Sequence, residues 1–373
     1  MNNKNSQPKV LISALDWGLG HATRIIPIIK YFKKRQWEVA LASSSEAYHL
    51  LKSTFPELLI FELPSYKASY KHKFMMLNIF QQLPRMQRAI KDENQKVKEI
   101  IQEFKADLII SDNRYGVYHS DIPSVFISHQ LQILPPNSLS ITEPAILKLH
   151  KKMMLPFDQI WVPDFQNEVN LGGRLSHPKK IDNNTIYIGP LSRFSQENNT
   201  SIKDTPLRDI NILAWISGPE PERENLEEIL LNQLQSINGN HVLLKGLPSE
   251  NSKTQFGNIM VYSHLHDKEL LALMPNVDLI ICRSGYSSIM DVFYLQKKAV
   301  FVATPRQTEQ VYLAEKLLEE KKFYSQKQSE VNVQEMLNNY NKYSGFERKL
   351  PIFEEQINRA INELGVIDRR GDE

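Results

Sequence analysis

The sequence has little cysteine and no long apolar run. Cys282 is the only cysteine among 373 residues and lies in the apolar segment Leu279–Cys282, so neither a disulfide within the chain nor a cysteine metal cluster can form. No stretch reaches the roughly 18 apolar residues of a membrane-spanning helix, and the first residues are polar. These absences are typical of a protein from a reducing compartment, and we expect it in the cytoplasm.

An excess of charge of one sign is also lacking. The chain has 45 Lys and Arg residues against 43 Asp and Glu residues, which gives a formal net charge of +2. Proteins that bind nucleic acid through its phosphates usually have a basic excess or a basic stripe. We therefore expect no nucleic-acid partner.

Short apolar, β-rich runs alternate with longer amphipathic stretches along the whole chain, a pattern that predicts βα units around parallel sheets. A chain of this length usually forms two domains. Strands are predicted at Val10–Ala14, Val39–Ala42, Leu58–Phe61, Leu108–Ser111, Val125–Ser128, Gln159–Val162, Thr185–Ile188, Ile210–Ile216, His241–Lys245, Ile259–Tyr262, Leu279–Cys282, Ala299–Ala303 and Lys322–Tyr324.

A polar stretch rich in Asn and Ser separates two halves that repeat the same pattern of strand, loop and helix. It begins after Gly189-Pro190 and predicts an interdomain linker. We thus expect Rossmann-like domains at 1–190 and 207–345, a linker at 191–206, and a closing helix with a disordered tail at 346–373. The fold class is α/β.

The first strand ends in a glycine-rich loop, in which Gly18, Gly20 and His21 precede a helix. Glycines let the backbone approach a ligand closely, and a helix N-terminus offers free N–H groups to an anion. A dinucleotide fingerprint would need a third small residue at Thr23 and an acidic residue about 20 positions further on, which argues against an oxidoreductase. His21 is predicted to act as a base, and a turn-stabilising role is the alternative.

The second half contains a similar loop after a buried strand. It contains Arg283, Ser284 and Gly285 and leads into a helix with hydroxyl groups in its first turn. Asp291 follows at helical spacing, so hydroxyls and carboxylate share one face. We expect these groups to bind a diphosphate and a ribose, with a capping box of Ser288 and Asp291 as the alternative. The predicted ligand residues of this loop are Arg283, Ser284, Gly285, Tyr286, Ser287, Ser288 and Asp291.

One βα unit later, Thr308, Glu309 and Gln310 begin another helix at the same edge of the predicted sheet. Open α/β sheets bind ligands at this edge. We expect these residues to complete the donor site; the alternative is an ordinary helix start capped by Thr308.

With these motifs in view, the chain resembles the GT-B glycosyltransferases of family 28, which have two Rossmann-like domains facing each other across a cleft. Gly18, Gly20 and His21 are similar to the family's N-terminal glycine-rich loop. Arg283–Gly285 with Asp291 resembles its donor phosphate and ribose site, with Asp in place of the usual Glu. The resemblance makes Gln310 a contact of the donor sugar. It also makes His129, in Ser128-His129-Gln130, a second catalytic candidate.

Two departures limit the resemblance. The loop Ser217–Glu222 stands where the family has a glycine-rich phosphate loop, but two prolines remove N–H donors and two glutamates would repel phosphate. We expect contacts only from Ser217 and Gly218, with help from Arg223. The segment between Tyr66 and Asn94 differs from the peptidoglycan enzyme of the family, so that enzyme's acceptor is not carried over.

The resemblance implies an inverting transfer of a sugar, such as N-acetylglucosamine, from a UDP-sugar to a lipid-linked or glycan acceptor. No Asp-x-Asp motif occurs, so no metal clamp for the diphosphate is expected, and no cofactor besides the UDP-sugar as co-substrate. His21 is the preferred base, with Asp16, Asp112 and His129 as reserves.

Two other functions remain open: a nucleotide-sugar epimerase or hydrolase, and a non-catalytic nucleotide-sugar-binding protein. A peripheral membrane contact through residues 67–88 is a further alternative, because Lys67, Lys71 and Lys73 precede an apolar run that Arg85 and Arg88 follow. The same run would otherwise be the packed face of a long helix.

Overall fold

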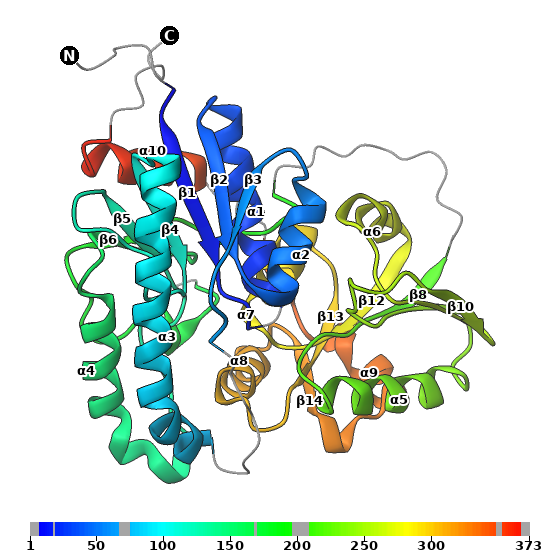
Figure 1. The fold of residues 1–373 in the computed structure, drawn as a ribbon. Coiled ribbons are helices and arrows are strands. Elements are labelled where there is room, and N and C mark those ends of the chain that lie inside the picture. The colour runs from blue at the N-terminus through cyan, green and yellow to red at the C-terminus, as the bar shows by residue number, and fades with distance from the viewer. Residues whose placement is uncertain are drawn as a thin grey trace. The chain divides into compact units, whose positions relative to one another are not determined.

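The protein is described from a computed structural model, and the description covers residues 7–17, 19–66, 75–167, 170–195, 209–347 and 353–366. The chain divides into two compact units. The first contains Met1–Leu191 and Pro351–Glu373, and the second contains Ser192–Leu350 (Figure 1). Each unit is an α/β domain around its own sheet, which confirms the predicted fold class.

The sheet of the first unit has seven parallel strands in the order β3-β2-β1-β4-β5-β6-β7. Its central strands are mostly apolar and contain no exposed residue, as expected of parallel strands covered on both faces. The strands are β1 (Lys9–Ala14), β2 (Glu38–Ser43), β3 (Leu59–Glu62), β4 (Leu108–Asp112), β5 (Ser124–Ile127), β6 (Gln159–Val162) and β7 (Thr185–Tyr187).

Five α-helices accompany this sheet in the described residues: α1 (Leu19–Lys34), α2 (Ser45–Thr54), α3 (Met75–Phe104), α4 (Glu143–Met154) and α10 (Phe353–Glu363). Val97, Ile100 and Phe104 of α3 pack with Leu11 and Ile109 of the sheet in one core cluster. The C-terminal helix α10 also belongs here, because Ile357 and Ala360 are fully buried and the Gln159 side chain donates to the Ala360 carbonyl at 3.1 Å.

The second unit has a seven-stranded sheet in the order β10-β11-β9-β8-β12-β13-β14, parallel except for the β10–β11 pair. Its strands are β8 (Ile210–Trp215), β9 (Asn240–Leu244), β10 (Lys253–Phe256), β11 (Ile259–Tyr262), β12 (Val277–Cys282), β13 (Ala299–Ala303) and β14 (Tyr324–Lys327). The α-helices are α5 (Glu222–Leu234), α6 (Asp267–Leu273), α7 (Tyr286–Leu295), α8 (Thr308–Glu319) and α9 (Val333–Asn339).

Two strand predictions differ from the structure. β10 was not predicted, because all four of its residues are exposed and polar residues fill most of this edge strand. The last strand begins at Tyr324 rather than Lys322, because Phe323 is buried beside the rings of Phe301 and Phe346 before the pairing with β13 starts. The other predicted strands are present to within a few residues.

Both sheets have a point at which the order of the strands reverses. In the first, β1 lies between β2 and β4, and Ala14 pairs with Asp112. In the second, β8 lies between β9 and β12, and Trp215 pairs with Cys282. Loops that leave the carboxyl ends of these neighbouring strands turn to opposite faces, which leaves a crevice where open α/β sheets bind ligands.

Within the described residues, no helix is long and apolar enough to cross a membrane. Most of the basic and apolar segment at 67–88 lies outside the described residues. Residues 67–74 are not described, and for residues 75–83 only the helical backbone is described. The membrane contact therefore remains a prediction.

Candidate functional site

Three predicted residues of the first unit meet around one carboxylate. Asp112 is the last residue of β4, His21 lies in the first turn of α1, and His129 follows β5. The Nδ1 atom of His21 is 2.8 Å from Oδ1 of Asp112. The carboxyl ends of parallel strands meet at one edge of a sheet, which explains why side chains distant in sequence converge there.

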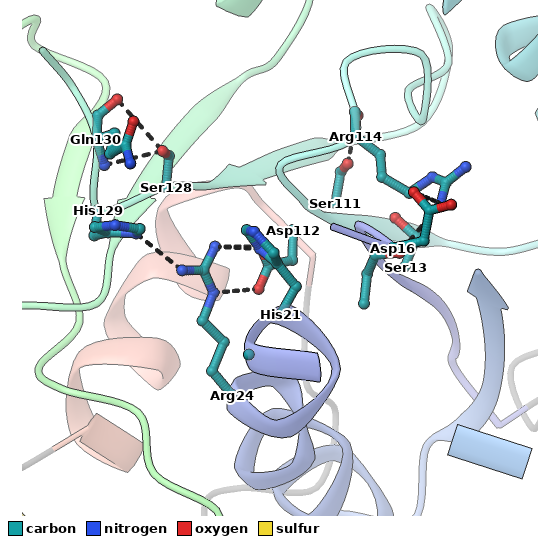
Figure 2. Close-up of polar contacts among 12 residues, drawn as sticks. Ser13, Asp16, His21, Arg24, Ser111, Asp112, Arg114, Ser128, His129 and Gln130 are labelled. Carbon is teal, nitrogen blue, oxygen red and sulfur yellow. Dashed lines mark hydrogen bonds and ion pairs between the residues drawn. The ribbon is translucent and has the colours of Figure 1, made fainter. Parts of the chain in front are cut away.

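Arg24 connects the three residues and is the functional residue that the sequence analysis missed (Figure 2). Its Nε and Nη2 atoms donate to the two carboxylate oxygens of Asp112, and its Nη1 atom donates to Nδ1 of His129 at 2.9 Å. Arg24 is only 2% exposed. The available signal was its spacing of three residues from His21, which places both on one face of α1.

The charges of this group favour a neutral His21. Burial and the positive charge of Arg24 lower the pKa of His21, and the nearby Asp112 only partly opposes them. Burial alone would raise the pKa of Asp112, but Arg24 and His21 hold it below its usual value. An ionised Asp112 accepts a hydrogen bond, so Nδ1 of His21 carries the proton and Nε2 keeps its lone pair. The His21 side chain is 16% exposed, so a substrate can reach the imidazole ring.

Of the two predicted glycines here, Gly18 lies outside the described residues, and Gly20 is in the first turn of α1. The Thr23 hydroxyl donates to the Gly20 carbonyl at 3.1 Å. Thr23 thus stabilises the start of the helix that positions His21.

Asp16, a reserve candidate for the base, lies in the loop after β1. Its Oδ2 atom accepts hydrogen bonds from Ser45 and Ser65, at 3.2 and 2.6 Å. Its buried Oδ1 atom has no hydrogen-bond partner among the described residues, and Arg114 is 4.0 Å away. Beside it, Trp17 is 45% exposed, which is unusual for so large an apolar side chain.

Buried groups support the exposed Trp17 ring. Tyr66 lies edge-on to Trp17 at 6.4 Å between ring centroids, and its hydroxyl donates to Glu93. Glu93 in turn forms a fully buried ion pair with Arg114. This network holds the loop after β1 in a defined conformation at the carboxyl edge of the sheet.

In the second unit, the loop after β8 contains Ser217 and Gly218. Gly218 has a φ of +117°, which residues with a side chain rarely adopt. A Cβ atom at this glycine would lie 3.5 Å from the Thr304 hydroxyl and 3.8 Å from Nε of Arg283. The structure therefore brings the loops after β8, β12 and β13 together at one edge of the sheet.

The glutamates of the β8–α5 loop were expected to repel phosphate, and the structure gives each a cationic partner. Glu220 pairs with Arg223, and Glu222 pairs with Arg306 at 2.8 Å. Arg223 also pairs with Glu227 at 2.6 Å. The repulsion of a bound diphosphate by these acids is thus weaker than the sequence alone indicates.

Arg283 is buried beneath the loops and binds backbone oxygens. Its guanidinium group donates to the carbonyls of Ser217 and Glu222, at 3.2 and 2.6 Å, and to those of Val302 and Ala303, at 3.4 and 3.3 Å. Burial lowers its pKa to about 10, so the group stays charged at neutral pH. In this structure Arg283 fixes three loops relative to one another, and its predicted contact with phosphate remains a prediction.

We expect Arg283→Met to destabilise the protein by about 3 kcal/mol or more, because several buried carbonyl oxygens lose a charged donor. Urea denaturation of the full chain measures this change. Arg306→Met is the matched control, since the Arg306 side chain is 61% exposed and its ion pair contributes about 1 kcal/mol at most. Equal stability of the two variants would contradict the role given to Arg283.

The loop after β12 contacts the start of α8 through Gln310. The Ser284 hydroxyl donates to the Gln310 carbonyl at 2.8 Å, and the Gln310 side chain accepts from the Thr304 N–H at 2.9 Å and donates to Gln307 at 2.6 Å. Among the predicted donor residues, the partly or fully exposed ones are Ser217, Gly218, Gly285, Ser287, Ser288, Thr308, Glu309 and Gln310, and the buried ones are Arg283, Ser284, Tyr286 and Asp291.

Both helix starts differ from the capping alternatives. The N-cap of α7 is Gly285, which has no side chain to cap the helix, so Ser288 and Asp291 do not form a capping box. The N-cap of α8 is Gln307, without a side-chain cap, rather than Thr308. The N-terminal ends of α7 and α8 therefore retain the partial positive charge that favours an anion.

Asp291 has partners from the segment before β8. Its Oδ1 atom accepts from the Ser192 hydroxyl at 2.6 Å, and its Oδ2 atom is 3.4 Å from Nε of Arg193. Arg193 also pairs with Asp267 at 2.9 Å. Burial raises the pKa of Asp291 to about 6, although Arg193 and Ser192 favour its ionised form. The sequence did not indicate that this carboxylate would anchor Ser192 and Arg193.

Comparison with known proteins identifies the second unit more closely than the first. Residues 222–358 match the family model of the glycosyltransferase family 28 C-terminal domain. No curated protein sequence matches the chain.

Solved structures of similar fold cover nearly the whole chain, at identities that show the fold alone. MurG of Acinetobacter baumannii is 13% identical, with a TM-score of 0.54 over 98% of this chain and 100% of that chain. The spinosyn rhamnosyltransferase SpnG in complex with thymidine diphosphate is 10% identical, with a TM-score of 0.57 over 96% of both chains. A putative UDP-N-acetylglucosamine 2-epimerase of Listeria monocytogenes is 11% identical, with a TM-score of 0.59 over 99% of this chain and 100% of that chain.

The two observations agree on the class of protein. The fold of the chain is that of GT-B glycosyltransferases, and its second unit carries a family 28 C-terminal domain. Together they support a glycosyltransferase, and the resemblance to family 28 is confirmed for this domain.

Proposed function

We propose that the protein is an inverting, metal-independent glycosyltransferase that takes its sugar from a uridine-diphosphate donor. The observation that carries this proposal is the set of loops at the carboxyl edge of β8, β12 and β13, which lies mostly within the family 28 domain. SpnG holds a nucleoside diphosphate, and the Listeria protein is named for a UDP-sugar, which supports this class of donor.

The geometry of the second unit suits a diphosphate. The α7 N-terminus is not side-chain capped, and Gly285 lets a ligand approach its backbone. Gln310 lies beside Gly285 and is the proposed contact of the donor sugar. Asp291 is the proposed ribose acceptor, which would require the carboxylate to exchange its Ser192 hydrogen bond for a ribose hydroxyl.

Gly285→Ala tests the donor site without disturbing the fold. A Cβ atom here would meet only the Gln310 amide nitrogen at 3.8 Å, an ordinary contact, and the φ of −67° suits any residue. The unliganded variant should therefore be as stable as the wild type, or more stable by about 0.4–1 kcal/mol. The methyl group would cover the helix N-terminus, so we expect UDP to bind about tenfold or more weakly by calorimetry. Unchanged affinity for UDP would place the donor elsewhere.

The first unit supplies the proposed base. Nε2 of His21 takes the proton of the acceptor hydroxyl as the hydroxyl oxygen attacks the anomeric carbon. The bond from this carbon to the diphosphate oxygen breaks, and the diphosphate leaves with the electron pair. Because attack and departure occur on opposite faces, the configuration inverts. The helix N-termini of the second unit are the groups proposed to stabilise the leaving charge.

The enzyme should remain active in an excess of chelator. In the proposed mechanism, helix N-termini and neutral hydrogen-bond donors stabilise the negative charge of the leaving diphosphate, as a metal ion does in other glycosyltransferases. The measurement is UDP release with and without EDTA, after the protein has been dialysed against chelator. Loss of activity that magnesium or manganese restores would contradict the metal-independent mechanism.

The acceptor is proposed to be a glycan or a lipid-linked sugar. Trp17, exposed and supported by Tyr66, offers a flat apolar surface of the kind on which a sugar ring stacks, and it precedes His21 by four residues. A membrane contact through residues 67–88 would suit a lipid-linked form of the acceptor. Measuring UDP release with a panel of glycan acceptors and with the same sugars linked to a lipid would distinguish the two kinds of acceptor.

A nucleotide-sugar epimerase or hydrolase is the second candidate function, favoured by the similarity in fold to the Listeria protein. An epimerase or hydrolase consumes the UDP-sugar without an acceptor, whereas a transferase requires one. A non-catalytic binding protein shows no turnover under either condition. One assay of UDP-sugar consumption, with and without acceptors, thus distinguishes the three functions.

A further inference from the structure

Arg114 is a fully buried arginine whose donors reach the ends of three strands. It follows β4, and it is 0% exposed. Its Nη1 atom donates to the Ala14 carbonyl at the end of β1, at 3.3 Å, and to the Ser44 hydroxyl after β2, at 3.0 Å. Its Nη2 atom donates to the Pro64 carbonyl after β3, at 2.5 Å. Arg114 therefore fixes three loops of the first unit relative to one another at the carboxyl edge of the sheet.

The same guanidinium group supports Trp17 from two directions. Figure 2 shows it beside Asp16, the residue before Trp17, with 4.0 Å between Nη1 and Oδ1. It also lies 5.4 Å from the centroid of the Tyr66 ring, which packs edge-on to Trp17. Glu93 connects Arg114 and Tyr66, because it pairs with the guanidinium group and accepts from the phenol hydroxyl. Burial and the charge of Glu93 raise the pKa of Tyr66 well above its usual value, so this hydroxyl remains a donor.

Arg283 has the corresponding place in the second unit. β4 is the neighbour of β1, and β12 is the neighbour of β8, at the points where the strand order reverses. Arg114 is the second residue after β4, and Arg283 is the first residue after β12. Each donates to a carbonyl at or just beyond the end of the neighbouring strand, that of Ala14 in the first unit and that of Ser217 in the second. A buried arginine thus organises the loops of each unit: those of the proposed donor site in the second, and those around Trp17 in the first.

We propose that Arg114 is a positioning residue of the acceptor site, which holds the Trp17 ring where the apolar face of an acceptor sugar can stack on it. This inference rests on the proposed function. Trp17 is the group that contacts the sugar, and Arg114 acts through it. Because the Trp17 ring is 45% exposed, its orientation depends on the loop that carries it and on Tyr66. A displaced ring would lose its contact with the acceptor, whereas the proposed nucleotide site belongs to the other unit.

Fluorescence tests the positioning without any substrate. Arg114→Lys keeps the buried positive charge beside Glu93, but the ammonium group lacks the planar fork of donors that reaches all the acceptors at once. Subtracting the spectrum of the same protein with Trp17→Phe isolates the emission of Trp17 from that of the other tryptophans. In Arg114→Lys we expect this emission to shift to longer wavelength and to be quenched more strongly by acrylamide. Trp17 emission and quenching that Arg114→Lys leaves unchanged would overturn the proposal.

Acceptor kinetics test the consequence for binding. At saturating UDP-sugar, Arg114→Lys should raise the KM for the glycan acceptor about tenfold or more and keep kcat within about threefold of the wild type, the pattern of lost ground-state binding. Tyr66→Phe keeps the ring and removes the hydroxyl link to Glu93, so it should raise this KM too, and this test does not depend on Arg114→Lys folding. An unchanged KM in both variants would overturn the proposal.

Arg283→Lys is the matched control, because it alters the corresponding arginine of the other unit. It should change neither the Trp17 emission nor the KM for the acceptor. An equal rise of the acceptor KM in Arg283→Lys and Arg114→Lys would indicate a general loss of structure and would also overturn the proposal. A shift of Trp17 emission in Arg114→Lys, combined with a wild-type protein that shows no turnover of any UDP-sugar, would instead reject the proposed function.

Discussion

Replacing His21 by Ala should lower kcat by roughly 10²–10⁴-fold, the usual contribution of a general base. The affinity for UDP should stay near that of the wild type, because the proposed nucleotide site belongs to the second unit. Stopped assays of UDP release at saturating donor and acceptor give kcat, and calorimetry gives the UDP affinity. A joint loss of both would indicate a structural role for His21.

The pH dependence of kcat gives a second test of His21. Burial and the charge of Arg24 lower its pKa below the ordinary value of 6.5, so the imidazole is neutral at pH 7. As pH falls through this lowered pKa, His21 becomes protonated and the rate should fall. The acidic limb of the wild-type profile should therefore lie below pH 6.5 and be missing in His21→Ala.

The same shift has a consequence for stability. A histidine whose pKa is lowered by folding binds protons more readily in the unfolded chain. Its contribution to stability is fully present above pH 6.5 and is lost as pH falls toward the pKa of the folded state. His21→Ala should thus be less sensitive to mild acid than the wild type in urea denaturation.

His49→Ala is a suitable control for these measurements. His49 is an exposed histidine of the first unit, on α2, whose ring contacts Tyr48. It should change neither kcat nor the acidic limb. If His21→Ala retained most of the wild-type activity, the base would have to be sought among the reserves Asp16, Asp112 and His129, and His21 would be a turn residue.

Much of the fold could be predicted because parallel strands are short, apolar and regularly spaced. Runs such as Val10–Ala14 and Ala299–Ala303 are buried on both faces, so their short apolar sequences are typical of the inner strands of a parallel sheet. The edge strand β10 lacks this signal, because a strand at the edge of a sheet can consist of exposed residues. Local sequence therefore identified the strands that form the core and missed the one that does not.

The site could be predicted less completely, because its contacts depend on tertiary structure. His21, Asp112 and His129 were identified by their places after strands or by the resemblance, but nothing local indicates that Arg24 joins them. Arg283 shows the reverse difficulty. Its motif suggests a phosphate ligand, whereas its donors are directed at backbone carbonyl groups between β8 and α5 and at the end of β13.

The replacement Asp112→Asn should reduce kcat by a factor similar to that of His21→Ala, about 10²–10⁴-fold. The side-chain amide of Asn can donate to Nδ1 of His21, which would place the imidazole proton on Nε2 and remove the lone pair that accepts the substrate proton. Because Asp112 acts through His21, the double variant should be no slower than His21→Ala alone. A further drop in the double variant would show that Asp112 contributes independently of His21.

Asp112→Asn should also destabilise the fold, by about 3–5 kcal/mol, because the buried Arg24 loses its carboxylate. Glu93→Gln is the matched control: it breaks the Arg114 ion pair, which is equally buried in the same unit but does not involve His21. Both variants should unfold at lower urea concentrations than the wild type, and only Asp112→Asn should lose turnover at saturating acceptor. If Glu93→Gln lost as much turnover, lost stability or a displaced loop after β1, which Glu93 supports through Tyr66, would account for the defect, and the tautomer of His21 would not explain it.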